Sequence, residues 1–84
     1  MKKLYLDIHN HIEGLTAGAV EGAHAKDLET QAKYDANFLK YWFDESTGKV
    51  FCLIEAPSKE AAIAVHREAH GLLADELIEV QEGK

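Results

Sequence analysis

Segments in which apolar side chains recur at every second residue alternate along this chain with segments typical of helices. Residues 4–9 alternate strictly, with Leu4, Leu6 and Ile8 on one face and more polar side chains on the other. Good helix formers fill residues 17–34, and Thr16 is suited to cap their N-terminus. The sequence therefore predicts a strand followed by a helix.

The middle of the chain predicts a β-hairpin followed by a second helix. Residues 37–44 are rich in aromatic side chains, and Gly48 closes a turn in which a positive φ is expected. The strand VFCLIE follows at residues 50–55, and Pro57 and Ser58 suit the start of a helix that ends near Gly71. A last short strand is expected at residues 77–80.

The order strand, helix, hairpin, helix, strand is the split βαβ pattern. We therefore expect residues 1–84 to form one α+β domain, a ferredoxin-like βαββαβ sandwich. It has a four-stranded antiparallel sheet with two helices on one face.

The hairpin strands are apolar on both faces, which is unusual for a sheet that only two helices can cover. Strict alternation places Leu39, Tyr41 and Phe43 against Phe38 and Trp42, and Val50, Cys52 and Ile54 against Phe51 and Leu53. We therefore expect a homodimer in which a second copy covers the open sheet face.

Charge and cysteine content limit which binding partners and which cellular location are expected. Fifteen acidic residues against nine basic ones give a net charge of −6, and no basic cluster is present. This balance argues against a nucleic-acid or membrane partner. The single cysteine, Cys52, cannot form an internal disulfide, and no signal-peptide core or membrane span is apparent. We expect a cytoplasmic protein.

Five histidines in 84 residues direct attention to metal binding. His66 and His70 are four residues apart on the second predicted helix and so share a face, the spacing by which a helix offers two imidazoles to one ion. Glu68 does not directly follow the first histidine, so the metalloprotease motif is not met. The alternative is that both rings are structural, with His70 interacting with the helix C-terminus.

His9 and His11 flank the end of the first predicted strand. Because this strand ends beside the strand carrying Glu55, we expect His9 and Glu55 to lie close together. An imidazole with a carboxylate suits Ni²⁺ or Zn²⁺. For His11, a solvated loop position is favoured.

His24 lies on the apolar stripe of the first helix, between Val20 and Leu28, with Asp27 three residues further on. A lone histidine on such a stripe is favoured as a core residue bonded to Asp27, and a metal-bound ring oriented by Asp27 is the alternative. Cys52, between two apolar neighbours, is expected to be a small buried hydrophobe rather than a nucleophile. No phosphate loop, catalytic triad or paired-cysteine zinc motif is present.

Taken together, several short segments resemble a family of short bacterial proteins, largely of unknown function. That family includes a nickel-binding member with a dimeric ferredoxin-like fold. The resemblance covers about residues 4–80 and rests on Asp7–His9, His24–Leu28, Trp42, Gly48–Leu53, Glu55–Ser58 and Val65–Glu68. It implies a dimer and favours Ni²⁺. His9, His24, Glu55 and His66 lie inside the matching segments, whereas His11 and His70 lie outside them.

Three functional hypotheses follow. The first is a homodimeric protein that binds a divalent transition metal, nickel or alternatively zinc, through imidazole and carboxylate groups; the candidate ligands are His9, His24, Glu55, His66 and His70. The second is a small dimeric enzyme, an isomerase or cofactor-free oxygenase, with His24, Asp27 and His66 around a pocket between sheet and helices. The third is an interaction module whose histidines are structural.

Overall fold

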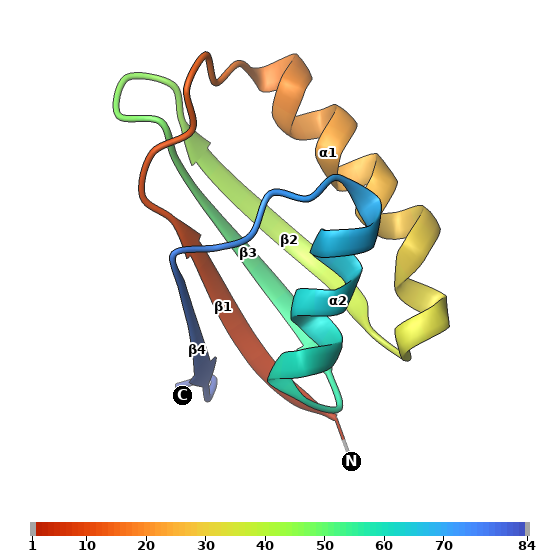
Figure 1. Ribbon diagram of the computed structural model, residues 1–84. Coiled ribbons are helices and arrows are strands. Elements are labelled where there is room, and N and C mark those ends of the chain that lie inside the picture. The colour runs from red at the N-terminus through yellow and green to blue at the C-terminus, as the bar shows by residue number, and fades with distance from the viewer. Residues whose placement is uncertain (1, 84) are drawn as a thin grey trace.

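The computed structural model describes residues 2–83 and contains one four-stranded antiparallel sheet with two α-helices on one face (Figure 1). The sheet order is β2-β3-β1-β4, so the predicted ferredoxin-like fold is confirmed. The elements are β1 (Lys3–His9), α1 (Ala17–Thr30), the 3₁₀ helix η1 (Gln31–Tyr34), β2 (Asn37–Asp44), β3 (Lys49–Ala56), α2 (Lys59–Ala69) and β4 (Glu76–Val80).

Local sequence signals place both helices. The Thr16 hydroxyl accepts a hydrogen bond from the Ala19 amide at 3.1 Å, and Ser58 caps α2 in the same way at 3.2 Å from the Ala61 amide. Pro57 precedes this cap rather than lying in the first turn. No helix within residues 2–83 is both long and apolar enough to cross a bilayer.

The central strand β1 directs its more polar face, rather than its apolar face, toward the helices. Tyr5, Asp7 and His9 are buried beneath the helices, whereas the leucines and isoleucine between them are only partly covered, on the other face. Antiparallel pairing with β3 sets Tyr5 opposite Ile54 and Asp7 opposite Cys52. The inner face of the sheet therefore carries a carboxylate and an imidazole within the core.

A register shift between Phe38 and Lys40 changes which side chains of β2 point toward the helices. Phe38 is buried opposite Ile54, and Tyr41 then lies opposite Cys52 on the same, helix-covered face. The strict alternation expected for this strand, with Phe38 opposite in face to Tyr41, is wrong because the bulge adds a residue between them. Trp42 is 49% exposed and lies opposite Phe51.

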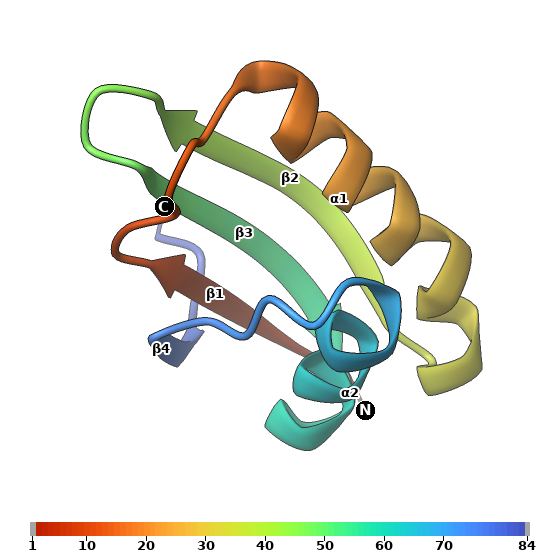
Figure 2. The same ribbon diagram turned by 45° about the horizontal axis from the view of Figure 1, so that its top comes forward.

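The sheet face away from the helices has no cover within the described chain, as both views show (Figure 1, Figure 2). The register of the paired strands identifies the apolar side chains on this uncovered face, and each of them is half-buried or exposed. They are Leu4, Leu6, Ile8, Trp42, Phe51, Leu53, Ile78 and Val80. We call this set the open face.

The hairpin turn holds the loop between β1 and α1. Gly48 has φ of 79°, and its carbonyl accepts a hydrogen bond from the Ile12 amide at 2.9 Å. The His11 Nδ1 atom lies 3.0 Å from the Thr47 carbonyl oxygen. A β-carbon on Gly48 would lie 2.7 Å from that Nδ1. This contact leaves room only for glycine at the turn.

Replacing Gly48 by Ala should therefore lower the free energy of unfolding by about 1–2 kcal/mol, because the left-handed backbone is strained and His11 must move. Urea unfolding measures the change. Gly18→Ala is the matched control: its β-carbon meets nothing within 4 Å, and it lies in α1, where alanine is the better helix former. Equal stability of the Gly48 variant and wild type would contradict the turn geometry.

Candidate metal centre

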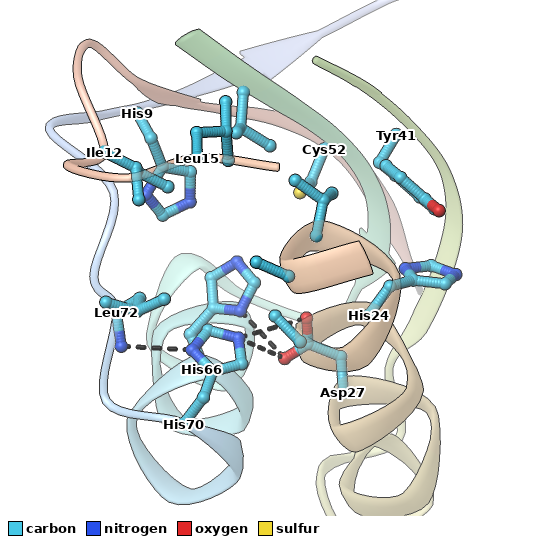
Figure 3. Close-up of a pocket in the computed structure, with 14 residues that line it drawn as sticks. His9, Ile12, Leu15, His24, Asp27, Tyr41, Cys52, His66, His70 and Leu72 are labelled. Carbon is cyan, nitrogen blue, oxygen red and sulfur yellow. Dashed lines mark hydrogen bonds and ion pairs between the residues drawn. The ribbon is translucent and has the colours of Figure 1, made fainter. Parts of the chain in front are cut away.

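His66 of α2 is held between two buried carboxylates. Its Nδ1 lies 2.9 Å from Asp27 Oδ1, and its Nε2 makes a short hydrogen bond with Asp7 Oδ2. The three residues come from α2, α1 and β1, and each is at most 4% exposed. Figure 3 shows the side chains of His66 and Asp27 meeting between the two helices. This contact joins three elements at one point inside the core.

The two carboxylates control the charge of the ring. Burial alone would lower the pKa of His66, but hydrogen bonds and charge interactions with Asp27 and Asp7 outweigh it and raise this pKa to about 9. Burial works against ionisation of Asp27 as well, yet the hydrogen bonds from His66 and His70 lower its pKa. Without a bound cation, His66 is therefore an imidazolium near neutral pH.

Two further donors stand beside the Asp7–His66 pair. Asp7, His9, Cys52 and His66 each direct one donor atom to a common point, with all four atoms within 4.8 Å of one another. We call this set the donor cluster. All four residues are buried, and His9 Nε2 lies 3.7 Å from Asp7 Oδ1. That Asp7 oxygen is buried and has no hydrogen-bond partner. An unpaired carboxylate oxygen in the core is costly, which makes this oxygen a candidate ligand for a cation.

The other two donors, His9 and Cys52, are both uncharged when no cation is bound. Burial lowers the pKa of His9, so its ring is neutral and has a free lone pair. Burial and the neighbouring Asp7 raise the pKa of the Cys52 thiol, which is consequently protonated when no cation is present.

A second group of potential donors, Asp27, His66 and His70, shares His66 with the donor cluster. His70 Nε2 lies 3.1 Å from Asp27 Oδ1 and 3.3 Å from Oδ2, while His66 Nδ1 bonds the same carboxylate. Both Asp27 oxygens are thus already paired. This group forms a closed hydrogen-bonded set that orients His66 and leaves its Nε2 facing the donor cluster.

A cavity of about 60 Å³ lies next to the donor cluster, beneath α1 and the loop that precedes it. His9, Cys52 and His66 line one part of it, and His24 and Tyr41 line another (Figure 3). Asp27 and His70 also line it. The rest of the wall is aliphatic, formed by Ile12, Leu15, Ala19, Val20, Ala23, Val50 and Leu72.

The structure brings together three of the five ligands expected from sequence: His9, His66 and His70. His24 lies instead against Tyr41, with ring centroids 4.6 Å apart, and its buried Nδ1 has no partner. The expected hydrogen bond between Asp27 and His24 is absent, because Asp27 faces α2 rather than its own helix neighbour. The histidine–aspartate base required by the enzyme hypothesis is therefore not formed.

Glu55 lies far from the other candidates. The expectation that it adjoins His9 is wrong, because antiparallel register sets His9 opposite Val50 and Glu55 opposite Leu4, on the open face. The Glu55 carboxylate accepts a hydrogen bond from Asn37 Nδ2 at 3.1 Å. His11 is exposed in its loop, as expected.

Sequence reasoning missed Asp7 and Cys52 as donors. A usable signal existed for Asp7, which shares a strand face with His9 at a spacing of two residues. No sequence signal pairs Asp7 with Cys52, because only the register between β1 and β3 does so.

The folded protein should lose stability as pH rises above neutrality. The pKa of His66 is about 9 against an ordinary 6.5, so its charged ring stabilises the fold fully below about pH 6.5, and this contribution disappears as pH rises through about 9. We expect the metal-free protein to lose about 2–3 kcal/mol of unfolding free energy over that range. In carbon NMR spectra, the His66 ring should titrate near pH 9, with a lower midpoint in Asp27→Asn. A wild-type midpoint at or below 6.5 would disprove the pairing of His66 with the two carboxylates.

Comparison with known proteins agrees with the fold. A family described as nickel responsive protein SCO4226-like matches residues 5–80. The crystal structure of SCO4226 from Streptomyces coelicolor A3(2) is similar to this chain, with 34% sequence identity and a TM-score of 0.89. The match covers 96% of this chain and 99% of the other. No curated protein gives a match. The resemblance drawn from sequence is thereby confirmed, and this chain belongs to the SCO4226-like family of nickel-responsive proteins.

Proposed function

We propose that this protein binds one divalent transition-metal ion, Ni²⁺, at the donor cluster formed by Asp7, His9, Cys52 and His66. The observation that carries the proposal is the buried Asp7 Oδ1, which lacks a partner although three other potential ligands surround it. A cation at this point would supply the missing interaction. Membership of a nickel-responsive family supports nickel as the ion.

The chemistry of the donors favours borderline transition metals. Two imidazole nitrogens, one thiol sulfur and one carboxylate oxygen suit Ni²⁺ or Zn²⁺, whereas Mg²⁺ and Ca²⁺ prefer oxygen ligands alone. A thiol ligand must remain reduced, which is consistent with the cytoplasmic location expected from the single cysteine.

Asp27 and His70 have a supporting role in this proposal. The hydrogen bond from His66 Nδ1 to Asp27 fixes the ring and leaves Nε2 as the ligand atom, an arrangement that recurs around metal-bound histidines. His70 acts through the same carboxylate. His24 and Glu55, both expected as ligands from sequence, are left out of the proposed ligand set.

Protons oppose binding at this cluster. His66 and Cys52 are both protonated without a cation, and each must lose its proton to become a ligand. Affinity should consequently rise with pH until the pKa of the ring, about 9, is reached, because below that pH the ion must displace a proton from His66.

The open face supports a homodimer as the second part of the proposal. Its apolar side chains come from all four strands and include Trp42 and Ile78, which are 49% and 44% exposed. A chain of 84 residues has a small core of its own, so burying this face against a second copy would add stability.

Calorimetric titration with Ni²⁺ and with Zn²⁺ tests the metal site. Wild type should bind about one ion per chain with a Kd of about 1 μM or lower. Cys52→Ser and His9→Ala should each weaken binding at least about tenfold, and Asp27→Asn should weaken it about 10–100-fold. All variants should bind more weakly at lower pH.

His11→Ala is the matched control for this titration, because it removes an exposed histidine outside the cluster. Its affinity should equal that of wild type. Loss of binding in this variant, with Cys52→Ser unaffected, would place the ion at the surface and rule out the donor cluster.

Light scattering of the eluting protein tests the dimer. Trp42→Lys places a charge on the open face and should shift the mass from dimer to monomer. Leu28→Lys is the control, since Leu28 is 45% exposed on α1 and away from that face. A monomeric wild type, or a Trp42 variant that stays dimeric, would refute this interface.

A further inference from the structure

Three of the four residues in the donor cluster also line the 60 Å³ cavity. His9, Cys52 and His66 border it, whereas Asp7 does not. The rings of His9 and His66 have centroids 5.6 Å apart and approach the cavity from opposite sides (Figure 3). Space therefore remains on one side of the cluster after its four protein donors have been counted.

The presence of such space distinguishes sites that bind an exchangeable ligand from purely structural metal sites. Structural sites are closed by protein ligands and packed side chains, whereas sites that handle an exchangeable ligand keep a position open to a cavity. In this protein the 60 Å³ cavity borders His9, Cys52 and His66, and a second hollow of about 210 Å³ borders Asp7 and His66 from another side.

The residues that line the cavity determine which kind of ligand it could hold. Neither lysine nor arginine lines it, and the His66 ring in the wall is already paired with the Asp27 carboxylate, so the described wall is not built for a phosphate or a dicarboxylate. The aliphatic residues Leu15 and Val20 offer contact to a short apolar body. At the far wall, the rings of His24 and Tyr41 pack against each other and add an aromatic surface. A volume of 60 Å³ is about twice that of a water molecule in the liquid, roughly 30 Å³.

We propose that this cavity holds a compact second ligand beside the donor cluster. The guest has about two to four non-hydrogen atoms, with one nitrogen or sulfur donor atom directed at the cluster. Its other end lies among the aliphatic side chains of the wall. The inference rests on the proposed metal site and adds to it a substrate class: a small donor molecule that exchanges at the ion.

The test uses Co²⁺ as a spectroscopic stand-in for the native ion and azide as the compact probe. Azide is titrated into the Co²⁺-loaded full chain, and the visible ligand-field bands are recorded. In wild type these bands should shift and saturate. Ala23→Leu, which fills the cavity from α1, should weaken azide binding at least about tenfold while Co²⁺ affinity changes less than about twofold. Ala25→Leu, on the exposed side of the same helix, should behave as wild type.

The outcomes separate the two proposals. No stoichiometric Co²⁺ binding by wild type would overturn both. Normal Co²⁺ binding with no azide response, or with equal responses in all three proteins, would overturn the cavity ligand and leave the metal site standing. A second probe makes the test independent of any variant: 4-phenylimidazole is too large for the cavity, and a band shift in wild type equal to that of azide would also overturn the inference.

Discussion

The charge pairing around His66 is the interaction on which the rest of the structure depends. The His66 ring of α2 pairs with one carboxyl group from β1 and one from α1, so three elements meet at one buried contact. Buried charges are tolerated only when they are paired, and removal of one partner typically costs about 3–5 kcal/mol. The same contact fixes the ring orientation that the proposed metal site requires. Stability and the proposed ion binding thus share one residue, and an ion bound there would replace a proton on His66.

This pairing explains why β1 is turned over relative to its hydropathy. Asp7 and His9 have to face the helices to reach His66, and the two-residue period of a strand then directs Leu4, Leu6 and Ile8 to the other side. The apolar side chains that a core would normally take are therefore on the open face. The proposed metal site and the proposed dimer interface therefore lie on opposite faces of one strand.

The five histidines divide into distinct positions. His9 and His66 belong to the donor cluster, and His70 bonds the carboxylate that orients His66. His24 lines the far wall of the cavity, while His11 secures the loop that covers it. The high histidine content predicted metal binding, but only some of these rings lie in the two groups of potential donors.

Sequence alone determined the elements and their order, because caps, turns and hydrophobic periods are local: Thr16, Ser58 and Gly48 act on residues within a few positions. It also named His9 and His66 as candidate ligands, and both lie in the donor cluster. The tertiary structure decided which side chains meet. Strand register is set between segments far apart in the chain, and it joined Asp7 to Cys52 and carried Glu55 to the opposite face. Pairing of buried charge then overrode hydropathy in β1, since an unpaired carboxylate in the core costs more than partly exposed leucines do.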